Sequence, residues 1–269
     1  MTWGYPTATQ THAGNRLIPC AQGRVLGGGS SINAEVFTRG VPQDYDRWAN
    51  EEGCTGWSFR DVQPYFLRSE GNTALADKWH GTDGPLGVSN IANPQPLTRA
   101  FVMACQQHGI PYNHDFNGAV QQGAGYYQLN VVDGQRCSAA RGYLSPARHR
   151  PNLTVLTRAM GRRLIIDGHR AKGVEYLHRG RVHTAYAECE LILTAGAIGS
   201  PKLLMLSGIG PGDHLRSLGM DVRADIEGVG ANLSDHVNID VVAELHGHES
   251  LDRYNKPHWA AWAGLSAIT

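Results

Sequence analysis

The fold of this chain is decided by a glycine-rich stretch at residues 23–33. It reads Gly23-Arg24-Val25-Leu26-Gly27-Gly28-Gly29-Ser30-Ser31-Ile32-Asn33. Three consecutive glycines followed by two serines suit neither the interior of a strand nor a stable helix. We expect a loop whose backbone comes close to something bulky, with Ser30 or Ser31 capping a helix that follows. Backbone N–H groups ahead of a helix N-terminus suit an anion such as a pyrophosphate, and a tight surface turn is the alternative interpretation.

A second glycine cluster follows an apolar run further along the chain. Residues 191–195 read Leu-Ile-Leu-Thr-Ala and are typical of a strand buried on both faces. They lead through residues 196–199 into a helix with Ser200 as N-cap, Pro201 in its first turn and its end at Ser207-Gly208. A buried strand, a glycine turn and a helix start form half of a nucleotide-binding unit, and a tight surface turn is again the alternative.

The remaining stretches divide into a helical part and a strand part. Residues 1–22 read as irregular, and residues 71–96, rich in Gly, Pro, Asn and Asp, as surface loop. Helices are predicted at residues 44–52, 58–70 and 97–108. From residue 152 the period changes, and strands are predicted at residues 153–157, 163–166, 173–177 and 182–187. Turn signals at residues 167–168 and 179–180 make the later strands an antiparallel meander.

Composition argues against several classes of function. The chain has 269 residues, 33 of them glycine, and its net charge of zero gives no sign of a nucleic-acid partner. No apolar run approaches the roughly 18 residues of a transmembrane segment, and the first residues do not resemble a signal peptide. Five scattered cysteines without a CxxC pair disfavour a disulfide framework or zinc site and indicate a reducing cytoplasm. No metal site is predicted: there is no HExxH, and His246 and His248 are expected to be solvated loop residues.

With their flanking residues, the two glycine clusters resemble the two signatures of the glucose–methanol–choline (GMC) oxidoreductases. The first is carried by residues 23–33 with Phe37, Arg39-Gly40 and Asp46, and the second by residues 196–210. Further similar segments lie within residues 56–66, 136–155 and 228–236, so the resemblance covers the chain to about residue 240. Residues 123–127 and 136–138 look most like the choline and alkanol dehydrogenase branch of the family.

The resemblance implies an α/β (α+β) fold in which an incomplete FAD/NAD(P)-binding domain is interleaved with an antiparallel-sheet substrate domain. Residues 1–70 would be an FAD-binding segment with the first signature, and residues 71–150 mainly substrate-domain and lid segments. Residues 151–235 would be an FAD-binding segment with the meander and the second signature, and residues 236–269 the start of the substrate domain.

The resemblance also implies which residues contact FAD. They are Val25, Gly27, Gly28, Gly29, Ser30, Asn33, Ala34, Glu35, Val36, Gly161, Ala195 and Gly196. Residues 25–30 would lie near the pyrophosphate and flavin, residues 33–36 would run past the isoalloxazine ring, and Gly161 would contact the adenine through its backbone. For Asn33 the alternative is a capping or turn asparagine, and for Glu35 a solvated helix residue. Some members carry a flavin-linking histidine at the position of Ile32, so FAD is expected to be bound non-covalently.

The implied activity is oxidation of the CH–OH group of a small-molecule alcohol, with hydride passing to flavin N5. Oxygen, a quinone or another acceptor would reoxidise the flavin. The chain has no GxGxxG loop, with which the family binds the pyrophosphate. No catalytic residue is predicted, because the chain does not reach the family's C-terminal histidine, and His236 is expected to be structural. The alternatives are a flavin-containing hydroxynitrile lyase-like member and a catalytically inactive fragment or split-gene product. A cytoplasmic location is expected, with membrane association through the electron acceptor as a further option.

Overall fold

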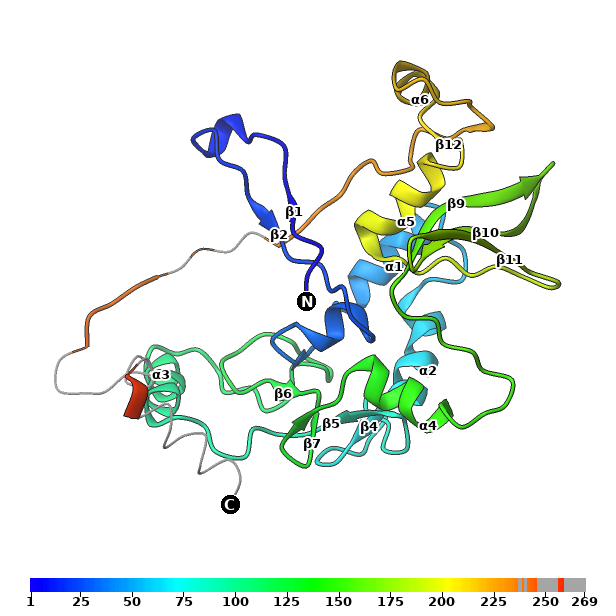
Figure 1. Ribbon diagram of the computed structural model, residues 1–269. Coiled ribbons are helices and arrows are strands. Elements are labelled where there is room, and N and C mark those ends of the chain that lie inside the picture. Colours follow the sequence, from blue (N-terminus) through cyan, green and yellow to red (C-terminus); the bar gives the residue numbers. More distant parts are fainter. Residues whose placement is uncertain (237–238, 240, 246–255, 259–269) are drawn as a thin grey trace. The chain divides into compact units, whose positions relative to one another are not determined.

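The chain forms two compact units (Figure 1). The computed structural model describes residues 1–236, 239, 241–245 and 256–258. Unit 1 is built from Met1–Ile32 and Ala139–His236, and unit 2 from Asn33–Ser138 with the described residues that follow residue 236. This two-part construction agrees with the interleaved α/β (α+β) fold that the sequence predicts. The predicted segment boundaries at residues 70, 150 and 235 stay a prediction.

Unit 1 is centred on a three-stranded antiparallel sheet. Its strands are β9 (Ala159–Asp167), β10 (Arg170–His178) and β11 (Arg181–Tyr186), in the order β11-β10-β9. Gly168 and Gly180 occupy the connecting turns with φ of 57° and 75°, which glycine adopts without a steric penalty. Helix α5 (Gly196–Met205) packs against β9. The predicted meander is therefore confirmed.

Two strands predicted for unit 1 are absent from it. Residues 191–194 form no strand, and Ile192 is 73% exposed. A strand of this kind needs hydrogen-bonding neighbours, and no strand in the described part of the chain pairs with it. Residues 153–157 are likewise irregular. Helix α5 begins at Gly196, four residues before the predicted N-cap, and the Ser200 hydroxyl accepts a hydrogen bond from the Ala195 N–H at 3.0 Å.

Shorter elements complete unit 1. Strands β1 (Tyr5–Pro6) and β2 (Pro19–Cys20) pair around a 3₁₀ turn at Thr11–Ala13, so residues 1–22 are a hairpin and not irregular as predicted. Helix α6 (Gly212–Ser217) lies between the parallel strands β12 (Ile209–Gly210) and β13 (Ala224–Asp225) and buries Leu215 completely. A five-residue π-helix, Ala140–Leu144, is followed by α4 (Ser145–Ala147).

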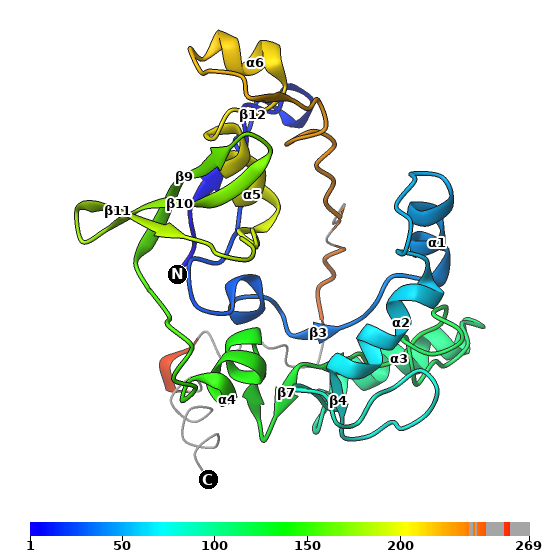
Figure 2. The same cartoon turned by 90° about the vertical axis from the view of Figure 1, so that its right-hand side faces the viewer.

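Unit 2 contains the three predicted helices. They are α1 (Pro42–Asn50), α2 (Phe59–Ser69) and α3 (Pro96–Gln107), and α1 contacts α2 (Figure 2). The Ser58 side chain accepts a hydrogen bond from the Asp61 N–H, while Asp61 accepts from the Ser58 N–H, as the predicted capping box requires.

Short strands connect these helices. Antiparallel pairs join β3 (Val36–Phe37) to β6 (Gln128–Leu129) and β7 (Val131–Val132) to β8 (Gln135–Arg136). A parallel pair joins β4 (Glu70–Asn72) to β5 (Leu86–Val88). The prediction of a surface loop over residues 71–96 is wrong, because Val88 and His80 are buried there.

Candidate cofactor site

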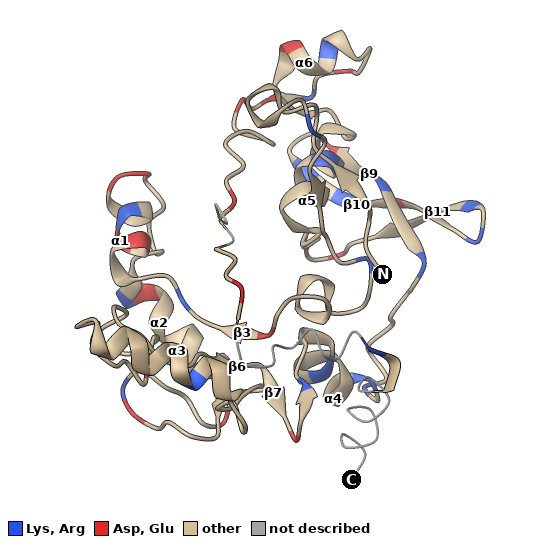
Figure 3. Cartoon of the chain, turned by 90° about the vertical axis from the view of Figure 1, so that its left-hand side faces the viewer, with Lys and Arg blue, Asp and Glu red and all other residues tan. Residues whose placement is uncertain are grey.

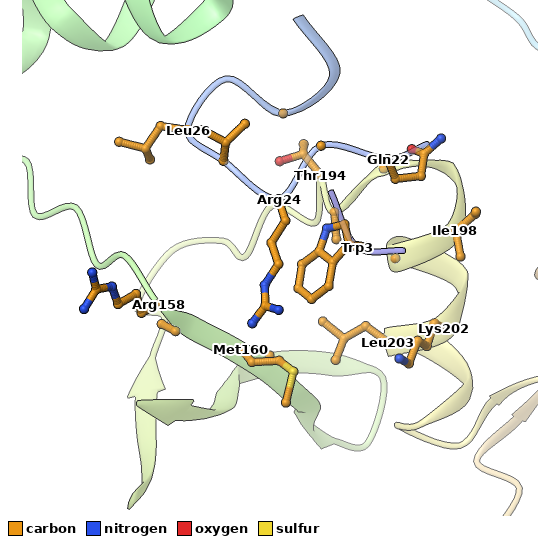
Figure 4. A pocket seen from close by; sticks show the side chains of 18 of the residues that line it. Trp3, Gln22, Arg24, Leu26, Arg158, Met160, Thr194, Ile198, Lys202 and Leu203 are labelled. Atoms are coloured by element: carbon orange, nitrogen blue, oxygen red, sulfur yellow. The ribbon is translucent and has the colours of Figure 1, made fainter. Parts of the chain in front are cut away.

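A groove of about 1830 Å³ lies within unit 1 (Figure 4). Its walls come from residues 22–29, the stretch 156–163 at the start of β9, and residues 194–206 on α5 and the turn before it. The volume exceeds the about 300–1,000 Å³ that is usual for small-molecule pockets. The groove therefore has room for an extended ligand such as a dinucleotide.

The glycine loop forms one wall of this groove. Gly27 and Gly28 are left-handed, with φ of 87° and 54°, and a 3₁₀ helix covers Gly28–Ser31. Ser30 Oγ donates to the Gly27 carbonyl at 2.6 Å, and Ser31 Oγ donates to the Leu26 carbonyl at 2.7 Å. The prediction that Ser30 or Ser31 caps a following helix is wrong, because both hydroxyls are used to close the loop on itself.

Gly29 lies in the part of this loop that is open to the groove. Its φ is not positive, and a Cβ built on it would meet no atom within 4 Å. Neither backbone conformation nor crowding within this chain therefore explains a glycine there, although glycine weakens a helical turn. A ligand lying against the backbone would account for it, because a side chain would then occupy the ligand's place. This open cradle fits the pyrophosphate of a dinucleotide.

Basic side chains dominate the groove. Its charged lining residues are Arg24, Arg158, Arg162, Arg163, Lys202 and Glu175. Arg162 and Arg163, neighbours on β9, both bind Glu175, at 3.1 and 3.2 Å. Figure 3 shows basic residues in blue on this strand. In the part of the chain that the structure describes, no carboxylate lies within 4.0 Å of Arg24, Arg158 or Lys202. The groove thus carries an excess of positive charge that suits phosphates.

Two of the basic side chains, Arg24 and Lys202, lie over aromatic rings. The Trp3 and Tyr5 rings stack with centroids 6.0 Å apart. The Arg24 guanidinium lies 4.6 Å from the centroid of Trp3, and Figure 4 shows both side chains in the groove near Met160 and Leu203. The second ring of the stacked pair, Tyr5, has the Lys202 ammonium 5.9 Å from its centroid. Cation–π attraction holds Arg24 beside the glycine loop.

The structure brings together seven of the twelve predicted cofactor residues. Lining the groove are Val25, Gly27, Gly28, Gly29, Gly161, Ala195 and Gly196. Ser30 is engaged in the loop itself, accepting a hydrogen bond from the Ala139 N–H at 2.9 Å. Asn33, Ala34, Glu35 and Val36 belong to unit 2 and do not line this groove. Contact of any of the twelve with a cofactor stays a prediction.

Sequence reasoning missed most of the other groove residues, among them five aromatic and basic side chains. These are Trp3, Tyr5, Arg24, Arg158 and Lys202. The alternation of Trp3 and Tyr5 could have suggested a strand that presents both rings on one face. No pattern announces Arg158, whose φ of 56° is rare for a residue with a side chain.

Other predicted features are tested less directly. Glu35 is not in a helix: its φ is 65°, and its carboxylate pairs with Arg136 at 2.8 Å, so the interpretation as a solvated helix residue is wrong. Asn33 does make a turn, since its Oδ1 accepts a hydrogen bond from the Glu35 N–H at 3.1 Å. His236 is exposed, and His246 and His248 lie outside the described residues. Among the described residues, no three His, Cys, Asp or Glu gather as metal ligands, and no helix is long and apolar enough to cross a membrane.

The chain is similar to known proteins over most of its length. The model of the GMC oxidoreductase family matches residues 6–238. An oxygen-dependent choline dehydrogenase from Sinorhizobium fredii is 46% identical over 235 residues, which are 87% of this chain and 42% of that protein. The chain therefore spans about two fifths of the length of the curated relatives it matches.

Solved structures share the fold. Pyridoxine 4-oxidase from Mesorbium loti superposes with a TM-score of 0.80 at 35% identity, over 84% of this chain and 45% of that one. An FAD-dependent oxidoreductase from Chaetomium thermophilum gives a TM-score of 0.79 at 30% identity, over 84% of this chain and 41% of the other.

Proposed function

The chain belongs to the GMC oxidoreductase family, and from this premise we propose that it forms the central part of an FAD-dependent enzyme that oxidises the CH–OH group of a small-molecule alcohol. The observation that carries the proposal is the open space at Gly29, beside a groove whose Arg24, Arg158 and Lys202 pair with no carboxylate among the described residues. The named relatives are dehydrogenases and oxidases, so the hydroxynitrile lyase alternative is not favoured.

The groove residues would hold the dinucleotide. Val25 and Gly27–Gly29 would contact the pyrophosphate through their backbone, with Arg24 supplying charge. Gly161 would face the adenine, and Ala195 and Gly196 would cover the nucleotide opposite the glycine loop. Ser30 and residues 33–36 would lie toward the flavin. Ile32, an aliphatic side chain without a nucleophilic atom, leaves the cofactor non-covalently held.

Flavin, when bound, supplies an N5 atom that accepts hydride from the alcohol carbon. The residues of this chain would bind and orient the dinucleotide, and the groove would shield it from water. The reaction also needs a general base for the hydroxyl proton. None of the described histidines is assigned that role: His236 is exposed and His80 is held between two carboxylates.

Choline is the first substrate to test, because the chain is 46% identical to a choline dehydrogenase over the matched part. Other small alcohols are the second choice, because pyridoxine 4-oxidase is similar in structure. The electron acceptor would be oxygen, a quinone or another molecule. The compound that reoxidises the reduced flavin would identify it.

The experiment is anaerobic reduction of the purified intact protein. We expect the protein to carry flavin absorbance and to lose it when choline or another alcohol is added, and to regain it with oxygen or a quinone. A protein that binds no FAD would contradict the proposal. A protein whose flavin stays oxidised while it cleaves a cyanohydrin would support the lyase instead.

A further inference from the structure

Glu35 adopts a backbone conformation that it does not favour. Its φ of 65° lies in the left-handed region, where a side chain is crowded against the backbone. Such a conformation persists only when its surroundings hold it, and it is concentrated at functional sites. Glu35 is also one of the four residues that, in the proposed function, run past the isoalloxazine ring.

Arg136 supplies the contacts that hold Glu35. Its Nη2 lies 2.8 Å from Glu35 Oε1, and its Nη1 donates to Asn33 Oδ1 at 2.7 Å. Asn33 Oδ1 in turn accepts from the Glu35 N–H at 3.1 Å. One guanidinium therefore fixes both the side chain of Glu35 and the turn that precedes it, using two nitrogens of a rigid fork.

The same segment is tied down from its other side. The Glu35 carbonyl accepts a hydrogen bond from the Asn130 N–H at 2.7 Å, and the next residue, Val36, pairs with Leu129. The Asn130 carbonyl accepts from the Cys137 N–H at 2.8 Å, directly after Arg136. Residues 33–36 are thus clamped by backbone contacts to Leu129 of β6 and to Asn130, and by the side chain of Arg136 on β8, all within unit 2.

Burial distinguishes this pair from an ordinary surface ion pair. The side chains of Arg136 and Glu35 are 30% and 24% exposed. A more exposed pair such as Arg216–Asp213, at 59% and 101%, contributes little, because water screens it and both side chains lose freedom. The Arg136 contact is partly shielded, and it acts on a strained backbone that has other conformations available.

We propose that Arg136 is a positioning residue: its guanidinium keeps Glu35 in the left-handed conformation and thereby sets the course of residues 33–36. The effect on flavin rests on the proposed function, in which these residues face the isoalloxazine ring. Arg136 itself need not touch the cofactor.

The variants separate positioning from charge. Arg136→Ala removes the fork, and Arg136→Lys keeps the charge but not the two-pronged contact. Glu35→Gly removes the need for a clamp, because glycine adopts a positive φ without strain. Arg216→Ala is the matched control, an arginine that pairs with Asp213 and whose partner has no positive φ.

Two measurements are made on each variant of the intact protein. The first is amide hydrogen exchange of residues 33–37 without added FAD, which does not depend on any cofactor. The second is FAD affinity together with the fluorescence of the bound flavin. We expect Arg136→Ala to speed exchange about tenfold and to weaken FAD binding by a similar factor, and Arg136→Lys to fall between. In the Glu35→Gly background, Arg136→Ala should have little further effect on either.

The results test two points: whether Arg136 holds Glu35, and whether this positions residues 33–36 toward flavin. Unchanged exchange in Arg136→Ala, or an equal loss in the Glu35→Gly background, would overturn the clamp. Faster exchange with unchanged FAD affinity and fluorescence would overturn its role in positioning toward flavin. If the wild-type protein takes up no FAD, the proposed function fails and the flavin part of this inference fails with it, while the exchange data still report on the clamp.

Discussion

His80 Nδ1 lies 2.8 Å from Glu70 Oε1, and both side chains are completely buried. On the other side of the ring, His80 Nε2 lies 3.1 Å from Asp115 Oδ2. The second oxygen of Glu70 binds Arg39, whose side chain is 5% exposed. Both ring nitrogens face carboxylates, an arrangement that favours the charged imidazolium, and in that form two cations alternate with two anions inside unit 2.

The first prediction concerns pH. Burial by itself would lower the pKa of His80, but hydrogen bonds and charge from Glu70 and Asp115 outweigh it, so the pKa is raised above its usual value. Folding then binds a proton more tightly, and this contribution to stability is fully present below the unfolded pKa of about 6.5 and lost as pH rises through the folded pKa. We expect the melting temperature to fall over that window.

The His80→Gln variant should flatten this pH dependence, as measured by thermal melting at a series of pH values. His108→Gln, at an exposed position of the same unit, should leave the pH profile unchanged. A wild-type profile that rises through the same window would mean that His80 is neutral in the folded protein.

The second prediction concerns Glu70. Glu70→Gln leaves the cations of Arg39 and His80 buried beside a neutral amide, and we expect the free energy of unfolding to fall by about 3–5 kcal/mol. Urea denaturation measures this loss. Glu52→Gln is the control, because Glu52 and Arg47 are about half exposed at a distance of 3.6 Å, and it should cost less than about 1 kcal/mol. Equal losses would show that the buried network contributes no more than a surface pair.

The third prediction separates ligand from fold at Gly29. Gly29→Ala should leave the apo-protein as stable as the wild type, or more stable by about 0.4–1 kcal/mol, because the new methyl group meets nothing and the unfolded chain loses freedom. It should weaken FAD binding about tenfold or more, because the methyl group takes space from the ligand. Thermal melting and FAD titration test the two halves. Gly228→Ala is the control, because a Cβ there also meets nothing within 4 Å. It should change stability as Gly29→Ala does and leave the affinity for FAD unchanged.

The fourth prediction concerns the charge beside the glycine loop. Arg24→Gln should weaken FAD binding about tenfold at low salt, because a charge-assisted contact with phosphate is lost. The difference from wild type should shrink as salt screens the field. Arg68→Gln removes another arginine that stacks on a ring, 5.0 Å from the Tyr65 centroid, and should leave binding unchanged. A salt-independent loss in Arg24→Gln would indicate a packing defect instead.

The fifth prediction concerns attachment of the flavin. Because Ile32 has no nucleophilic atom, acid precipitation of the protein should leave the flavin in the supernatant. Ile32→Val is a control that should behave identically. Flavin that stays with the precipitate after washing would place a covalent link at another residue.

Local signals in the sequence predicted what depends on local structure. The capping box at Ser58 and the Gly168 and Gly180 turns act over a few residues, so α2 and the meander could be predicted. The stretch 191–194 could not, because an apolar run becomes a strand only beside a partner. The buried network was missed for a different reason: Glu70, His80 and Asp115 are polar, so no hydrophobic period marks them as interior.

For the candidate site too, local features could be predicted from the sequence and long-range contacts could not. Glycine clusters revealed the loop at Gly27–Gly29 and the turn at Gly196, since glycine type and spacing are visible in the sequence. The contact between Arg136 and Glu35 joins residues about a hundred positions apart in the sequence. The positive φ of Glu35 could not be predicted either, because glutamate is not a residue type that favours it. Long-range contacts and backbone strain need coordinates.

The split construction of unit 1 has a consequence for biosynthesis. The glycine loop leaves the ribosome before its opposite wall, which begins about 130 residues later, near Gly161. At about 5–20 residues per second, translation takes roughly 7–26 s to cover that interval. During this time residues 33–138 emerge and are free to collapse around their polar interior, while the early loop has no partner wall. If the groove holds FAD as proposed, its two walls can close on the cofactor only after residues near Gly161 have emerged.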